Sequence, residues 1–109
     1  MNVINLVQND TAPDITMALY DAIANAPVDV SSVGTTVRMY FRKEGATSFV
    51  TLVASKPNGG VDGVVSFPWG ATDLSSAGPH EGEVEITFNT GKIQTLPDKL
   101  RFFVREQIG

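Results

Sequence analysis

The clearest pattern in the chain is an alternation of apolar and polar residues in its last third. It runs through residues 81–88 and again through residues 100–105. A period of two is typical of a strand with one buried face, because successive side chains point to opposite sides. Between the two segments, residues 89–91 (Asn-Thr-Gly) suit a tight reversal. We therefore predict two strands of one hairpin, with the inward side chains Val84, Ile86, Phe88, Leu100, Phe102 and Val104.

The same alternation, or a run of strong β formers, recurs along the rest of the chain. It predicts further strands over residues 3–7, 15–20, 35–43, 49–54 and 64–69. In the strand 35–43 the inward positions are Val37, Met39 and Phe41, so that Arg38, Tyr40 and Arg42 face outward. In the strand 15–20, Ile15, Met17 and Leu19 are expected to face inward.

Turn-forming residues separate these strands. Asn58-Gly59-Gly60 is the strongest turn signal, since its residues accept positive φ at little cost. Pro68 cannot donate a ladder hydrogen bond, so the strand around it should end there or lie at an edge. Residues 9–14, 21–26 and 70–79 are expected to be loops. Residues 27–34 form a connector whose Val28, Val30 and Val33 should tuck under a sheet edge.

The pattern as a whole predicts a single all-β domain over residues 1–109. It gives about seven short strands and no helix, which favours an antiparallel β-sandwich. The chain length of 109 residues fits one domain with a core of its own. Trp69 and Phe67 share one strand face and join the predicted core, whose strongest candidates are Trp69, Phe67, Val84, Ile86, Phe88 and Phe102.

Charge and composition narrow the class of partner. The net charge is −4, and residues 1–34 hold four aspartates (Asp10, Asp14, Asp21 and Asp29) without any Lys or Arg. Nucleic acid is not expected as a partner, because phosphate binding needs clustered basic residues. The acidic segment could meet a basic partner or could serve only solubility. A membrane is not expected either, because no run approaches about 20 apolar residues and no secretory leader is evident.

The residues that could carry chemistry are few. The chain has no cysteine and one histidine, so a metal site would need His80 together with Glu81, Glu83 or Glu85. An outward row of glutamates is more simply a solvated strand face paired with arginines. We find no nucleophile motif and no phosphate-binding loop, and no spacing selects a pair of catalytic carboxylates. We therefore expect a protein that is not an enzyme and holds no cofactor or metal.

Aromatic residues on outward strand faces are the remaining lead. Tyr20, Tyr40 and Phe103 face outward if the predicted strand phases hold. Exposed aromatic side chains are typical of protein interfaces. They could also stack on sugar rings, or a second layer could cover them.

The order of motifs resembles a known family. The motifs are residues 6–11, 27–31, 36–43, 62–69, 77–86 and 91–97, which together span nearly the whole chain. Their order resembles the immunoglobulin-like N-terminal domain of tailed-phage baseplate upper proteins and related virion structural proteins. His80 stands where the family often has Tyr, and the chain ends at Gly109 without the stalk of those proteins. The receptor-handling role of the stalk is therefore not implied.

What the resemblance implies is an immunoglobulin-like sandwich of a phage particle. Its function would be structural: an adaptor that docks onto other phage proteins in the baseplate, tail or fibre attachment, in a homo-oligomer or symmetric array. A capsid decoration or neck protein is the alternative within this class, and a carbohydrate-binding module is the alternative outside it. The virion is the expected location, after synthesis in the host cytoplasm. The expected docking residues are Arg38, Tyr40, Arg42, Asp10, Asp14 and Phe103.

Overall fold

The computed structural model describes residues 3–109, and within that range the chain is all-β without a helix. Ten strands form one large sheet and two small ones. In chain order they are β1 (Val3–Val7), β2 (Ile15–Ala18), β3 (Tyr20–Asp21), β4 (Ala26–Pro27), β5 (Thr36–Lys43), β6 (Val50–Val53), β7 (Val64–Phe67), β8 (Gly78–Thr87), β9 (Ile93–Thr95) and β10 (Leu100–Arg105).

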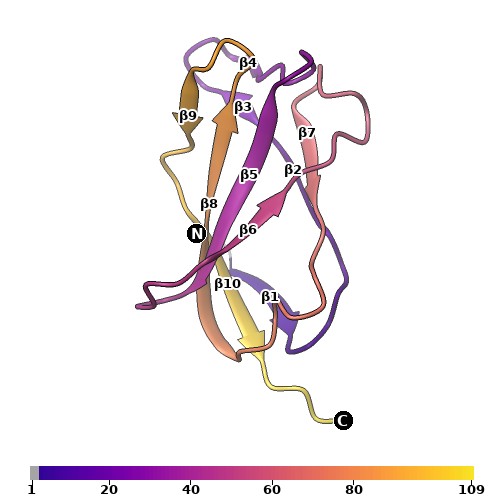
Figure 1. Ribbon diagram of the computed structural model, residues 1–109, viewed down its shortest axis with the longest axis vertical. Helices are drawn as coiled ribbons and strands as arrows, with labels where there is room; N and C mark the ends of the chain where they lie inside the picture. The colour runs from indigo at the N-terminus through magenta and orange to yellow at the C-terminus, as the bar shows by residue number, and fades with distance from the viewer. Residues whose placement is uncertain (1–2) are drawn as a thin grey trace.

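The large sheet has six strands, arranged around β8 and β5 at its centre. Its order is β1-β10-β8-β5-β6, and β9 pairs with the upper part of β8 on the same side as β10 (Figure 1). All neighbours are antiparallel except β1, which runs parallel to β10. The long strands β5 and β8 pair over eight positions, from Thr36 opposite Thr87 to Lys43 opposite His80.

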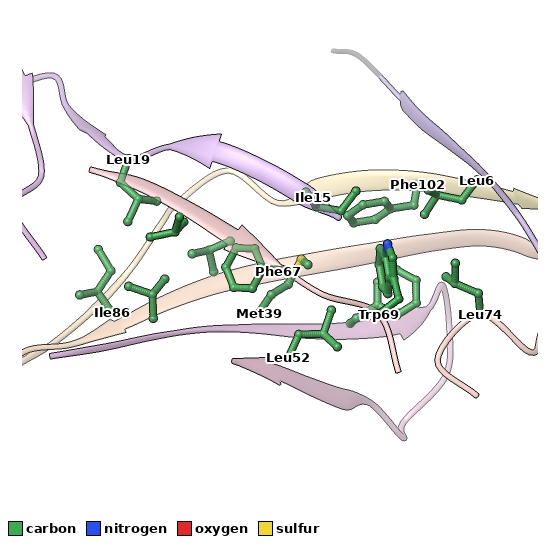
Figure 2. Packing of buried hydrophobic residues seen from close by; sticks show 14 of the residues in the cluster. Leu6, Ile15, Leu19, Met39, Leu52, Phe67, Trp69, Leu74, Ile86 and Phe102 are labelled. Atoms are coloured by element: carbon green, nitrogen blue, oxygen red, sulfur yellow. The ribbon is translucent and has the colours of Figure 1, made fainter. Parts of the chain in front are cut away.

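A smaller antiparallel sheet of β2 and β7 covers one face of the large sheet. Figure 2 shows the core between them, where Ile15 and Phe67 of the small sheet, and Leu19 just after β2, meet Met39 and Ile86 from the large one. The third sheet is the short hairpin of β3 and β4, at the upper end in Figure 1. Among residues 3–109 no sheet covers the opposite face of the large sheet, here called the outer face.

The predicted core residues largely occupy this interior. Phe67, Trp69, Val84, Ile86 and Phe102 are buried, whereas Phe88 is only partly buried and packs against the cluster. Phe41, Trp69 and Phe102 pack edge to face, with ring centroids 4.9, 5.2 and 6.0 Å apart. The Trp69 indole N–H also donates to the Pro13 carbonyl at 3.0 Å, so the one buried polar atom of this side chain is satisfied.

The structure corrects the sequence prediction in several places. There are ten strands in the described range rather than about seven, because the short strands β3, β4 and β9 were not predicted. Strand β8 begins at Gly78, inside the segment predicted to be a loop. The predicted final hairpin exists, but its return strand is split into β9 and β10, with Pro97 in the gap. Val33 is 97% exposed, whereas Val30 is buried as predicted.

Two further observations describe the molecule as a whole. Its principal extents are 43 × 24 × 23 Å, so it is elongated along the strands. Within residues 3–109, the structure has no helix of the length and apolar character needed to cross a bilayer.

Candidate interaction surface

The outer face of the large sheet carries a ladder of opposite charges across its two central strands. Strand alternation turns Arg38, Tyr40 and Arg42 of β5 outward, and the register places them opposite Glu85, Glu83 and Glu81 of β8, respectively. Opposite charges on directly paired strand positions stabilise a sheet modestly. The three β5 residues that the sequence assigned to an outward face therefore do lie together on one surface.

Glu81 is the centre of this charge network. Its carboxylate accepts from Arg42 Nε at 2.7 Å and contacts Lys99 Nζ at 3.4 Å. Only 12% of the Glu81 side chain is exposed, whereas about half of each cation remains in water (40% and 45%). The hydrogen bond from Arg42, assisted by Lys99, holds the pKa of Glu81 below its ordinary value despite the opposing effect of burial. Glu81 is therefore a fixed negative charge at neutral pH.

An aromatic pair lies beside this network. The Tyr40 hydroxyl donates to Glu85 Oε1 at 3.0 Å, and this bond raises the pKa of Tyr40. Phe49 precedes β6 and packs edge to face on Tyr40, with ring centroids 5.4 Å apart. Phe49 is 56% exposed, so much of its ring remains open to a partner. A large apolar side chain left in water is an unfavourable exposure that docking would relieve.

Together these residues line a shallow groove of about 280 Å³ on the outer face. One wall is aromatic, and the floor and rim carry two carboxylates and two cations: Tyr40, Phe49, Glu81, Glu83, Arg42 and Lys99. Such a mixture can bury an apolar side chain of a partner while its charges fix orientation. The lowered pKa of Glu81 is the opposite of what a general acid at neutral pH requires.

Of the predicted docking residues, Tyr40 and Arg42 line the groove, Arg38 lies on the same face outside it, and the others lie elsewhere. Phe103 is on the outer face of β10, opposite Pro79, but does not line the groove. Asp10 and Asp14 lie in the loop between β1 and β2, which leads away from the large sheet toward the small one. Tyr20 is exposed on β3, where its hydroxyl bonds the Asn25 side chain. The structure therefore gathers Arg38, Tyr40 and Arg42 and separates them from the two aspartates.

The remaining aspartates of the acidic first third hold turns. Asp21 Oδ1 accepts the backbone N–H groups of Ile23 and Ala24 in the β3–β4 hairpin. Asp29 Oδ1 accepts from the Ser31 hydroxyl and N–H, and these bonds lower its pKa. Both are local side-chain-to-backbone caps. The acidic segment is therefore spread over separate loops and is not one docking patch.

His80 faces the interior, away from the glutamates with which it might have held a metal. It is 3% exposed, its ring stacks on Phe41 at 4.8 Å, and Nδ1 lies 2.9 Å from the Gly78 carbonyl oxygen. Glu81, Glu83 and Glu85 alternate along β8 with the inward-facing residues and point to the outer face, on the other side of the sheet from His80. In the part of the chain that the structure describes, no three metal-ligating side chains of His, Cys, Asp or Glu gather.

Sequence reasoning missed two residues of the groove, Phe49 and Lys99. Phe49 had been assigned to a strand without a role, although alternation with Leu52 inward places it on the same side as Thr51 and Val53. Lys99 lies in the interruption between β9 and β10, a break that periodicity does not reveal. No protein-family model matches the chain, and no match was found among curated proteins either.

Proposed function

We propose that this protein is an immunoglobulin-like, non-enzymatic structural or adaptor protein of a tailed-phage particle. It would dock onto other structural proteins of the baseplate, tail or fibre attachment, and its location would be the virion. The proposal rests on the resemblance of its motif order to phage domains of this kind and on the character of its outer face. The observation that carries it is the groove in which exposed Phe49 lies within a frame of paired charges.

The strand order supports the immunoglobulin-like part of the proposal. In variable-type immunoglobulin sandwiches one sheet contains strands G, F, C and C′, and the facing sheet contains B and E. Here β10, β8, β5 and β6 follow one another in that spatial order, and β2 pairs with β7 in the second sheet. Chain order also agrees, since β2 and β5 precede β6, and β7 precedes β8 and β10.

The chemistry of the groove supports a protein partner. Aromatic residues and arginine are enriched in the centres of protein interfaces, and charges at the rim steer and orient the partner. A modest interface of this size is sufficient in a particle, because repeated copies on a symmetric assembly raise the effective concentration of each contact. Partner binding would then need no deep pocket.

Cryo-electron microscopy of the phage particles that encode this chain tests the proposal. Ordered density for the chain at symmetric positions, with Phe49 and Tyr40 in a contact with another protein, is the expected result. Density on the capsid or neck would favour the alternative of a decoration or neck protein. Absence of the chain from purified particles would overturn the proposed function.

The groove favours one alternative outside this class, a carbohydrate-binding module. Aromatic rings beside carboxylates are able to stack on a sugar ring and bond its hydroxyls. Glycan binding by the native chain that is lost in Phe49→Ser and retained in Ile93→Ser would support this alternative. Ile93 is a suitable control because it is 63% exposed on β9 and does not line the groove.

A further inference from the structure

Strand β6 is an open edge of the large sheet. Within the described residues it pairs with β5 on one side only. On its other side the chain makes one bridge, in which the N–H groups of Ser55 and Ser66 donate to each other's carbonyls at 2.8 and 3.0 Å. The next residue of the β7 segment in that register, opposite Val53, is Pro68, which has no N–H to continue the ladder. The β7 segment therefore does not pair with the edge of β6 in the residues that precede Ser55.

The backbone groups that point out of this edge can be identified. Ala54 N–H donates to the Val37 carbonyl at 2.9 Å, so the backbone of Ala54 faces β5. Antiparallel pairing alternates residue by residue, which turns Leu52 and Val50 toward β5 as well. Thr51 and Val53, which lie between these residues, direct their N–H and C=O groups outward. The same alternation, continued to Phe49 just before β6, turns its backbone outward as well. Within residues 3–109 no hydrogen bond satisfies these groups.

The same three residues carry their side chains on the outer face, and two of those side chains are exposed and apolar. Phe49 is 56% exposed and Val53 is 54% exposed. The whole segment 45–55 contains no charged residue. Natural proteins commonly protect an open edge with a lysine, a proline or a bulge. This edge has none of these within the strand.

We propose that the β6 edge pairs with β6 of a second copy of this chain, antiparallel and about a two-fold axis at Thr51. In a continuous sheet, outward backbone groups must meet outward backbone groups, so residues 49, 51 and 53 pair only with residues 49, 51 and 53 of the second copy. The register that engages all of them places Thr51 opposite Thr51. Phe49 then lies opposite Val53 of the second copy, and Val53 opposite its Phe49.

This register is self-complementary, which is what a two-fold interface requires. Each Phe49–Val53 contact removes from water two side chains that the single copy leaves exposed. An aromatic and a β-branched residue are also a favourable cross-strand pair. Because the segment is uncharged, two copies with a net charge of −4 each meet there without direct repulsion between like charges. The pairing does not depend on the particle proposed above, since it concerns this chain alone.

A single cysteine at the axis tests the proposal directly. The chain has no cysteine of its own, so Thr51→Cys introduces the only thiol. Residues that exchange both hydrogen bonds in an antiparallel pair have Cα atoms about 5.5 Å apart, within the span of a disulfide. We expect covalent dimers of Thr51→Cys after mild oxidation, resolved by non-reducing electrophoresis. Thr95→Cys is the matched control, because Thr95 is an exposed threonine on β9, at a different edge.

A second substitution in the Thr51→Cys background separates specific pairing from random collision. Val53→Lys places a charge against Phe49 of the second copy and should reduce the rate of cross-linking at least tenfold. Ile93→Lys, at a similarly exposed position on β9, should leave that rate unchanged. Light scattering of the native chain should show a mass rising with concentration toward twice 11.7 kDa. Cross-linking of Thr51→Cys no faster than that of Thr95→Cys, or unaffected by Val53→Lys, would overturn the proposal.

Discussion

Gly63 is the glycine at which an added side chain would lie closest to backbone atoms. Its φ is +75°, and a Cβ built on it would lie 2.5 Å from the Leu19 carbonyl oxygen and 3.0 Å from that of Val28. Both are backbone atoms, which cannot rotate away. We therefore expect Gly63→Ala to lower the free energy of unfolding by about 3 kcal/mol or more, combining left-handed strain with a steric clash. Urea denaturation with a constant m-value measures the loss.

Gly59 is the matched control for this prediction. It has a similar φ of +86°, but a Cβ there would meet no atom within 4 Å. Gly59→Ala should therefore lower the free energy of unfolding only by the intrinsic cost of a left-handed conformation, about 1 kcal/mol. Equal losses at the two positions would show that the contact with Leu19 is not what requires glycine at position 63.

Glu81 should make stability depend on pH in the acid range. Because Arg42 and Lys99 hold its folded-state pKa below the ordinary value of 4.5, its contribution to stability is complete above that value. The contribution is lost as the pH falls from about 4.5 through the lower folded-state pKa. Glu81→Gln should lower the free energy of unfolding by about 1 kcal/mol at pH 7, since the ion pairs of Glu81 with Arg42 and Lys99 are only partly shielded from water.

The acid titration of the same variant gives the sharper measurement. Asp29 and Asp62 also have lowered pKa values, through hydrogen bonds from Ser31 and from Val64 and Asn58, respectively, and so also titrate in this range. The diagnostic quantity is therefore the difference in unfolding free energy between native chain and Glu81→Gln. It should shrink as the pH falls below 4.5. A difference that is constant with pH would contradict the ion pair as its source.

Among the elements, the side chain of Trp69 connects the loop after β7 to the loop before β2. Trp69 packs against Phe41 and Phe102, and its indole donates to the Pro13 carbonyl. Trp69→Phe should keep most of the packing but leave that carbonyl without its donor, at a cost of about 1–2 kcal/mol. Trp69→Leu should cost more, because the aromatic contacts are lost as well.

The measurement for these two variants is urea unfolding followed by far-ultraviolet circular dichroism, because Trp69 is the only tryptophan and its fluorescence disappears with it. If Trp69→Phe is as stable as the native chain, the hydrogen bond to Pro13 does not contribute to the fold. If Trp69→Phe and Trp69→Leu lower the free energy of unfolding equally, aromatic packing at position 69 adds nothing to stability beyond the hydrogen bond to Pro13.

The sequence could predict those strands that bury one face along their whole length. Strands β5 and the inner part of β8 alternate cleanly, because their inward side chains all enter one core. Strands β3, β4 and β9 have two or three residues each, too short for a period to be visible. The start of β8 was missed because Gly78 and Pro79 favour a turn, and only pairing with β10 makes them a strand.

The surface was less predictable than the core. Alternation correctly turned Arg38, Tyr40 and Arg42 outward, because that depends on one strand alone. The groove depends on which strands become neighbours, and so Phe49 and Lys99 could not be assigned to it from their own segments. Val33 was placed under a sheet edge because it is apolar, yet it occupies a loop and is exposed. Local composition does not determine such long-range placement.

At the scale of the whole molecule, the large sheet offers two surfaces that differ in chemistry. The groove lies over β5 and β8 and combines charges with aromatic rings. The β6 edge is uncharged and offers backbone hydrogen bonds. Phe49 contributes to both, whereas Glu83 on β8 belongs to the groove alone, since β5 separates it from β6. A variant at Glu83 can therefore distinguish docking of another protein from pairing of two copies.

Glu83→Lys reverses the charge of one groove carboxylate and leaves the edge intact. Beside Arg42 and Lys99 it should cost no more than about 0.5 kcal/mol in stability, because all these groups reach water. We expect weaker incorporation of the variant into particles, measured by quantitative mass spectrometry against the native chain. Cross-linking of the double variant Thr51→Cys/Glu83→Lys should proceed at the rate of Thr51→Cys alone. A loss of cross-linking would mean that the two surfaces are not independent, whereas undiminished incorporation would mean that the partner binds outside the groove.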